Sequence, residues 1–341
     1  MAHVSNSPLL VFAESGIYCP VADVYIDPWR SVPKALITHA HADHAYSGHG
    51  QYIAAADSLP ILKYRLGDAI VIQGEPYGKL FTINGVRFSF HPAGHVIGSA
   101  QIRVEYRGEI WVVSGDYKMQ NDGISTPFEP VSCHHFITEA TFALPVFKWP
   151  APKAVAQEIN EWWASNADQG KISVLGGYSL GKAQRILQML NPSIGSIFTH
   201  GAVENTNEVL RAQRIPLEKT RRIEAHWEKK KHPGAMVICP PGAMGSGWMR
   251  RFGKAGTAFC SGWMALRGTR RRRAADRGFV ISDHVDWEDL NQAVNATGAE
   301  NVYVTHGYTH IYARYLREEC GLNAVPVETF YEGETLEGGD S

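Results

Sequence analysis

The stretch ALITHAHADHAYSGHG, residues Ala35 to Gly50, decides the fold class of this 341-residue chain. Directly behind a short apolar run, within eleven positions, it carries His39, His41, Asp43, His44 and His49. The apolar run is typical of a β-strand, and residues two apart at a strand end point to the same side. Ligand-type side chains held together at one rigid strand end indicate metal binding. We therefore expect a metal site here, with His49 outside it on the loop surface.

Composition limits the classes of protein to consider. The formal net charge is −1, so a polyanionic partner must be met by local basic clusters rather than by a global positive field. The five cysteines are odd in number and lack paired spacing, which favours a reducing compartment over a disulfide framework. No window approaches about 18 apolar residues. We expect a globular cytoplasmic protein with no membrane partner.

Further ligand-type residues follow other predicted strands. His95 follows FHPAG, Asp116 follows EIWVVSG, and His306 follows NVYVT. Clefts in layered α/β folds form beyond the carboxyl ends of strands, so such residues can converge without being neighbours in sequence. The pattern predicts two metal sites, whose ligands are His39, His41 and His95 at one, Asp43, His44 and His306 at the other, and Asp116 as a bridge between them.

The chain changes character near residue 149. About the first 140 residues are β-patterned runs with turns, such as KALITH, RFSFHPAGH, AQIRVEYRG and EIWVVSGD. Pro150 and Pro152 then precede a helical pattern, and ISVLGGYSLGKAQRILQML predicts a strand, a glycine turn and a helix that begins near Ser179. Strand signals return at AMVICPP, GTAFCSGWM, FVISDHVDW and NVYVTHG, before the helical THIYARYLREE. We predict boundaries that separate residues 1–148, 149–256 and 257–341.

The order of these ligands is similar to a known metal signature. H-x-H-x-D-H after a strand, with a later histidine, a strand-final aspartate and a last histidine, resembles the metallo-β-lactamase fold, a four-layered αββα sandwich of the α/β class. Asp27 in YIDP resembles that fold's first motif, an acid that orients the histidine loop. The 190 residues from Asp116 to His306 hold the α/β segment, and such an insert resembles a β-CASP cap domain. The resemblance implies that residues 149–256 are the cap.

The resemblance extends to a group of nucleases. ITEATF with Glu139, SDHVDW with His284 and VTHG with His306 are similar to the three added motifs of β-CASP nucleases. From about Gly16 to about Leu322, stretches such as HPAGHVIGSAQIRVEYRGEIWVVSGDYK and CSGWMALRGTRRRRAADRGFVISDHVDW resemble the bacterial ligase-associated DNA exonucleases, which are related to DNA cross-link repair nucleases. This implies a DNA-repair nuclease associated with an ATP-dependent DNA ligase and a helicase. His306 departs from the eukaryotic relatives, which typically lack it.

Such a nuclease would hydrolyse phosphodiesters by a hydroxide that two divalent ions activate. The resemblance implies catalytic roles for Asp116, His284 and Glu139: Asp116 bridges the ions, His284 donates to the scissile phosphate or protonates the leaving group, and Glu139 holds the ring of His284. Histidine-rich sites favour Zn²⁺, and Mn²⁺ or Fe²⁺ stay open.

Two segments are expected to contact DNA. The arginine run RGTRRRRAADRG lies just before His284, and guanidinium groups suit phosphate oxygens, so the expected contacts include Arg267, Arg270 and Arg272. The predicted helix start at Tyr178, Ser179 and Lys182 would hold a terminal 5′-phosphate, so that trimming proceeds from that end. The lysines of EKKKH, residues 228–232, lack a catalytic neighbour and are interpreted as solvated surface.

Other functions stay open on the residues alone. An RNA-processing β-CASP nuclease would use the same metals and the same His284, although the sequence shows no additional RNA-binding module. A small-molecule hydrolase of the metallo-β-lactamase fold would need neither the insert nor the arginine run. A nucleic-acid-binding protein without activity fits least, because no ligand position is missing.

Overall fold

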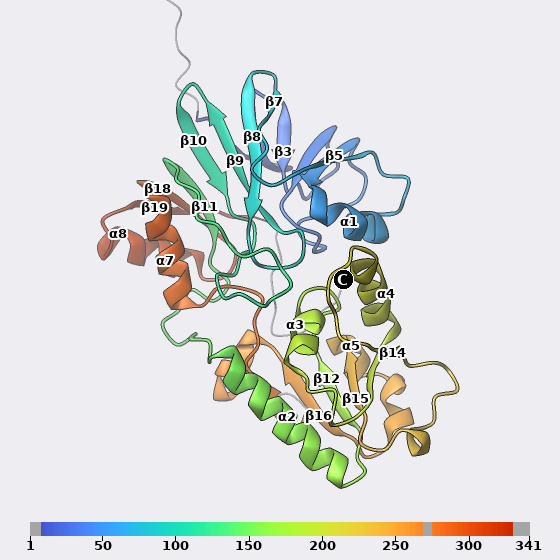
Figure 1. Cartoon of the computed structure of the whole chain (residues 1–341). Coiled ribbons are helices and arrows are strands. Elements are labelled where there is room, and N and C mark those ends of the chain that lie inside the picture. The colour runs from blue at the N-terminus through green and yellow to red at the C-terminus, as the bar shows by residue number, and fades with distance from the viewer. Residues whose placement is uncertain (1–7, 269–274, 330–341) are drawn as a thin grey trace, which may run out of the picture. The chain divides into compact units, whose positions relative to one another are not determined.

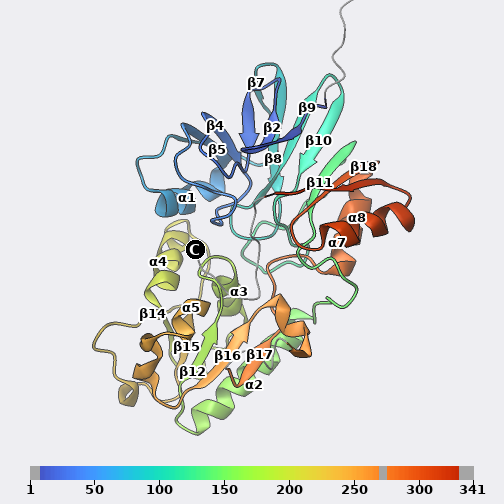
Figure 2. The ribbon, with the colours of Figure 1, turned by 180° about the vertical axis from the view of Figure 1, so that it is seen from behind.

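The structure, a computed structural model, describes residues 8–268 and 275–329, which divide into two compact units (Figure 1 and Figure 2). Unit 1 comprises residues 8–121, 125–144 and 287–329 of this part of the chain, and unit 2 comprises residues 122–124, 145–268 and 275–286. The domain boundaries at 148 and 256 stay predictions, and strands that follow residue 256 belong to the sheet of unit 2. None of the helices in the described ranges has the length and apolar character that a membrane crossing requires.

Unit 1 contains two sheets. The first has the strand order β1-β2-β3-β4-β5-β6, with bounds Val11–Ala13, Gly16–Cys19, Val24–Ile26, Lys34–Ile37, Gln51–Ala55 and Ile72–Glu75. The second has the order β19-β18-β11-β10-β9-β8-β7, with bounds Asn323–Pro326, Asn301–Thr305, His135–Glu139, Glu109–Val113, Ala100–Tyr106, Val86–Pro92 and Phe81–Ile83. Strands β3 to β6 pair in parallel, so their carboxyl ends lie at one edge of the first sheet.

One apolar core joins the two sheets of unit 1. Leu36 and Ile53 of the first sheet and Phe88, Val104 and Trp111 of the second belong to a single buried cluster. Helices α7 (Trp287–Thr297) and α8 (Thr309–Glu318) lie along β11, β18 and β19 of the second sheet, while α1 (Leu59–Leu66), which follows the short turn η1 (Ala56–Ser58), lies beside β6 (Figure 1). This mixed α/β fold with several sheets fits a metallo-β-lactamase-type sandwich.

Unit 2 is built on one parallel sheet. Its strand order is β14-β13-β15-β12-β16-β17, with bounds Arg221–Arg222, Ile197–Thr199, Met236–Cys239, Ser173–Gly176, Gly256–Cys260 and Arg277–Phe279. Its helices are α2 (Pro152–Asp168), α3 (Lys182–Met189), α4 (Gly201–Ala212) and α5 (Pro241–Met244), and its 3₁₀ turns are η2 (Lys229–Lys231), η3 (Gly247–Phe252) and η4 (Gly262–Ala265).

Apolar side chains cover both faces of this sheet. Leu175 of β12 packs in a cluster with Trp163 of α2 and Ile186 of α3. Val174, one residue earlier, points to the opposite face and packs in a cluster with Phe252 of η3. Burial on both faces explains why the central strands β12, β15 and β13 are buried at every residue and do not alternate between buried and exposed positions.

The predicted strands and helices are largely confirmed, but one helix begins later than predicted. α3 begins at Lys182 rather than near Ser179, and Gly181 at φ +90° is its N-cap. The Gln184 side chain holds the preceding turn: it accepts a hydrogen bond from the Gly181 N–H and donates one to the Ser179 carbonyl. The Gln184 side chain therefore closes the turn before α3. The backbone N–H groups at the start of the helix belong to Lys182 and the residues after it.

Candidate metal centre

Four of the predicted ligands converge at the end of β4. One ring nitrogen or carboxylate oxygen of each lies within 4.8 Å of those of the others, and the set comprises His39, His41, His95 and Asp116. Nδ1 of His41 lies 3.2 Å from Nε2 of His39 and 3.0 Å from Nε2 of His95. Oδ2 of Asp116 lies 3.5 Å and 3.7 Å from the same two Nε2 atoms. Three imidazole nitrogens and one carboxylate oxygen form a donor set that suits Zn²⁺ and also accepts Mn²⁺ or Fe²⁺.

A second group of three predicted ligands lies next to the first. Asp43, His44 and His306 also bring their ligand atoms within 4.8 Å of one another. Oδ2 of Asp43 lies 3.7 Å from Nε2 of His44 and 4.0 Å from Nε2 of His306. Oδ1 of Asp116 lies 3.5 Å from Nε2 of His44. The two oxygens of Asp116 therefore face different groups, which is the arrangement that a bridging carboxylate needs.

A buried hydrogen-bond network fixes the orientation of His44. Oδ2 of Asp27 lies 2.7 Å from Nδ1 of His44, and Asp27 also accepts hydrogen bonds from the backbone N–H and the hydroxyl of Thr38. A carboxylate can only accept, so Nδ1 carries the proton and Nε2 faces Asp43 and Asp116. Asp27 and His306 both have positive φ values, 42° and 59°, a backbone conformation that is uncommon for residues with a side chain but less so for aspartate and histidine.

Gly115 allows two of these segments to approach. Its φ is +56°, and a Cβ at this position would lie 2.6 Å from Oγ1 of Thr38. Thr38 precedes His39, and Gly115 precedes Asp116. A residue with a side chain would therefore push apart two of the segments that bring the ligands together.

The centre is shaped by burial and by acidic neighbours. Burial lowers the pKa of His39 well below its ordinary value. Burial also disfavours a charge on His44, but Asp116 and Asp43 outweigh it and raise the His44 pKa well above its ordinary value. Burial works against ionisation of Asp43, yet neighbouring His44 holds the Asp43 pKa below its usual range. Concentrated carboxylate charge of this kind favours a bound cation.

The two residues predicted to act with the metals lie in different units. Glu139, at the carboxyl end of β11 in unit 1, is buried and accepts a hydrogen bond of 2.9 Å from the Tyr117 N–H. His284, in unit 2, is buried on the segment after β17; its N–H donates to Oγ of Ser282 at 3.1 Å, and its carbonyl accepts from the Trp149 indole at 2.9 Å. Their joint catalytic role stays a prediction.

The predicted phosphate-binding lysine lies inside unit 2. Lys182 is fully buried, with Nζ 3.7 Å from Oδ2 of Asp283 and 4.8 Å above the Tyr178 ring. Arg185 contacts the other oxygen of Asp283 at 3.1 Å and Oδ2 of Asp122 at 3.0 Å. Sequence patterns predicted a role for Lys182 but not this network, because Asp122 and Asp283 are far from Lys182 and Arg185 in the sequence. Tyr178 and Ser179 are half-buried.

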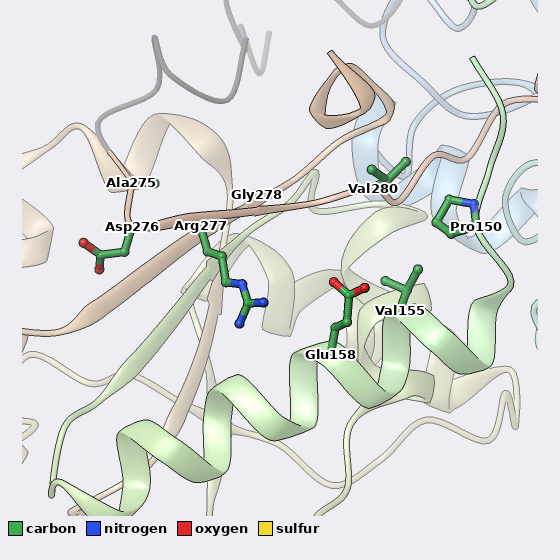
Figure 3. Close-up of a pocket in the computed structure, with 8 residues that line it drawn as sticks. All are labelled: Pro150, Val155, Glu158, Ala275, Asp276, Arg277, Gly278 and Val280. Carbon is green, nitrogen blue, oxygen red and sulfur yellow. The ribbon is translucent and has the colours of Figure 1, made fainter. Parts of the chain in front are cut away.

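The arginine run is only partly within the described residues. Arg270 and Arg272 lie outside them, and Arg267 is exposed. Arg277 lines a pocket of about 400 Å³ between α2 and β17, together with the acidic Glu158 and Asp276 (Figure 3). The charges in this pocket are mixed, so the pocket itself does not form a continuous phosphate track.

The prediction for His49 is wrong. The side chain is buried rather than on the loop surface, and its Nδ1 accepts a hydrogen bond of 3.3 Å from the Val32 N–H. Burial lowers the pKa of His49 to about 4, against the opposing charge of Asp27. A neutral ring therefore holds the loop that carries the ligands.

The chain is similar in sequence to several known proteins. No family model matches the chain. It is 28% identical over 312 residues to "Probable DNA ligase" of Opitutus terrae, which covers 91% of this chain and 30% of that protein. It is 24% identical over 223 residues to "RNase J-like protein" of Methanocaldococcus jannaschii, which covers 61% of this chain and 48% of that protein. The chain thus spans less than half of the length of each of these curated relatives.

A solved structure supports the fold alone. A crystal structure of a protein of unknown function from Enterococcus faecalis V583 aligns with a TM-score of 0.58 at 10% identity, covering 87% of this chain and 79% of that one.

The names of the sequence relatives point to the metallo-β-lactamase/β-CASP nuclease superfamily.

Proposed function

We propose that the chain is a metal-dependent DNA exonuclease of DNA repair that hydrolyses phosphodiester bonds. The observation that carries the proposal is the placement of Asp116, whose two oxygens face two adjacent groups of histidine and aspartate ligands. Two adjacent cations suit phosphodiester hydrolysis, because the reaction gathers negative charge on several oxygens at once. In this proposal residues 149–256 belong to a β-CASP cap.

The residues of the centre would have three kinds of role: binding the cations, orienting a ligand and transferring a proton. Bound divalent cations would supply Lewis acidity and a water of lowered pKa. His39, His41 and His95 would hold one cation, Asp43, His44 and His306 the other, and Asp116 both. Asp27 holds His44 in the tautomer that offers Nε2. We propose that His284 donates a proton to the leaving oxygen and that Glu139 orients the His284 ring.

The DNA assignment rests on the relatives. The relative named as a probable DNA ligase aligns with 91% of this chain, whereas the RNase J-like relative aligns with 61%. Association with an ATP-dependent DNA ligase and a helicase in the cytoplasm is part of the same proposal. An RNA-processing nuclease is the alternative, since ribonuclease names also occur among the relatives.

Digestion of matched oligonucleotides tests the proposal. Metal-free protein would receive Zn²⁺ or Mn²⁺ and then end-labelled DNA or RNA of one sequence, single- or double-stranded. We expect metal-dependent release of nucleotides from DNA at a higher rate than from RNA. Faster digestion of RNA would transfer the assignment to RNA processing, and the absence of hydrolysis of either would overturn the nuclease proposal.

The end at which trimming begins is a separate proposal. We propose that the turn at Tyr178 and Ser179 contacts a terminal 5′-phosphate. Because Asp283 already neutralises Lys182, the lysine would contribute less than a solvent-facing one. A charge-assisted hydrogen bond to phosphate contributes about 1.5–3 kcal/mol, so strands with a 5′-hydroxyl should be cleaved roughly tenfold more slowly. Ser179→Ala should reduce this ratio. Equal rates on both strands, or products only from the 3′ end, would contradict the pocket.

A further inference from the structure

Unit 2 carries a dense group of cations that the sequence does not place together. Residues 224–232 and 247–254 contain six lysines and arginines against two glutamates, in a chain whose net charge is −1. We call the six the basic patch: Lys229, Lys230, Lys231, Arg250, Arg251 and Lys254. η2 and η3 bring the two segments into contact, since a Cβ on Gly253 would lie 3.3 Å from Nζ of Lys229.

Packed aromatic side chains lie beneath the basic patch. Phe252 is fully buried, and its ring meets those of Trp227 and Trp248 at centroid distances of 5.3 Å and 4.9 Å. The Arg251 guanidinium lies 5.3 Å above Trp248, and its Nε donates to the Trp248 carbonyl. Of the two glutamates, Glu228 pairs with Lys231 at 2.8 Å. The basic residues therefore lie on well-packed structure, and they outnumber the acidic residues of the two segments.

The patch lies at the amino-terminal ends of the strands, whereas the predicted catalytic segments follow their carboxyl ends. Lys231 and Lys254 shortly precede β15 and β16, which flank β12 in parallel, as Figure 1 shows. The carboxyl end of β12 leads to Tyr178, and that of β17 leads to His284. A four-residue strand alone spans about 13 Å. The phosphates that contact the patch would therefore lie at the opposite ends of the strands from those segments.

We infer that the basic patch is a second contact surface for the phosphate backbone of nucleic acid, remote from the segment that carries His284. The inference rests on the proposed nuclease function, which provides a polyanionic substrate. Lysine is a compact point charge that suits sequence-independent phosphate contacts. The patch would hold strands that are long enough to reach it and would not contribute to short ones.

A matched pair of charge-neutralised variants tests the inference. The patch variant is Lys230→Gln/Lys231→Gln/Lys254→Gln. The control variant is Arg107→Gln/Lys153→Gln/Arg314→Gln, which removes the same charge at exposed positions outside the patch. Arg314 pairs with Glu318 much as Lys231 pairs with Glu228, so each variant breaks one exposed ion pair.

The measurement is the dissociation constant of labelled single-stranded DNA of about 30 nucleotides against salt, with hydrolysis stopped by a chelator. Each lost contact flattens the slope of log affinity against log salt by about 0.7, so the patch variant should lose about 2 and bind roughly ten- to a hundredfold more weakly near 0.1 M salt. The control variant should match wild type, and strands of about four nucleotides should bind all three proteins equally.

Two results would overturn the inference. One is an unchanged slope and affinity in the patch variant, which would leave an acidic protein as the partner of this surface. The other is an equal loss in both variants, which would show an effect of net charge alone. Failure of the nuclease proposal is read separately, from metal-dependent hydrolysis by the wild-type protein.

Discussion

The buried carboxylate of Asp27 lies 2.7 Å from Nδ1 of His44 and holds that ring so that Nε2 faces Asp43 and Asp116. Asp27 is not itself a predicted ligand, yet it is important for metal binding because it orients one. An acceptor at Nδ1 fixes the tautomer with a lone pair on Nε2, which is the form that binds metal.

Asp27→Asn should weaken the binding of one of two cations. The amide can still accept from the Thr38 N–H, but its NH₂ group would donate to Nδ1 of His44 and move the ring proton to Nε2. We expect a loss of about 10- to 100-fold in affinity, measured by competition with a coloured chelator. The exposed Asp57→Asn is the control. Wild-type affinity in Asp27→Asn would show that Asp27 does not set the tautomer.

Gly115→Ala should separate Thr38 from the Asp116 segment. Gly108 is a control of the same backbone type, because its φ is +88° and a Cβ there would meet nothing within 4 Å. Gly108→Ala should cost about 1 kcal/mol of unfolding free energy for its positive φ alone. Gly115→Ala should cost about 3 kcal/mol or more and also reduce metal content, measured by urea unfolding and elemental analysis. Equal costs in the two variants would remove the argument for a required close approach.

Sequence patterns predicted the positions of strands and ligands better than their surroundings. The run before His39 and the valines before His306 are short apolar stretches with turn signals, and local pattern suffices for these. The structure brings the seven predicted ligands into two adjacent groups, although metal binding itself stays a prediction. The burial of His49 and Lys182 was not predictable, because burial is set by the tertiary packing and their partners Val32 and Asp283 lie elsewhere in the sequence.

His49 should give a measurable pH dependence of stability. Its pKa is lowered by burial from 6.5 to about 4, so between these values the unfolded chain binds a proton that the folded chain does not. The stability contributed by the neutral ring is therefore present above pH 6.5 and is lost as the pH falls towards 4. The loss approaches about 3 kcal/mol.

His49→Asn isolates this contribution. Oδ1 of asparagine takes the place of Nδ1 and still accepts from the Val32 N–H, but it does not titrate. Urea unfolding at several pH values should show wild type losing more stability than the variant between pH 6.5 and 4. Parallel curves for the two proteins would mean that His49 is protonated within the folded chain.

Lys182 should be energetically coupled to Asp283. Both are buried, and breaking a buried ion pair by removing one partner typically costs about 3–5 kcal/mol. Because Arg185 also contacts Asp283, we expect about 3 kcal/mol for Lys182→Met. In a double-mutant cycle with Asp283→Asn, the cost of the pair should be at least about 1 kcal/mol less than the sum of the single costs. Additive costs by urea unfolding would leave Lys182 available for a phosphate.

The most direct test of the central claim is the titration of metal-free protein with Mn²⁺ or Zn²⁺ while the release of nucleotides from end-labelled DNA is followed. Asp116 faces both ligand groups, so the rate should rise until about two equivalents are bound. Asp116→Ala should show no appreciable rate at any metal concentration. Full activity without metal, a plateau at one equivalent, or near-wild-type turnover in Asp116→Ala would contradict a two-metal nuclease.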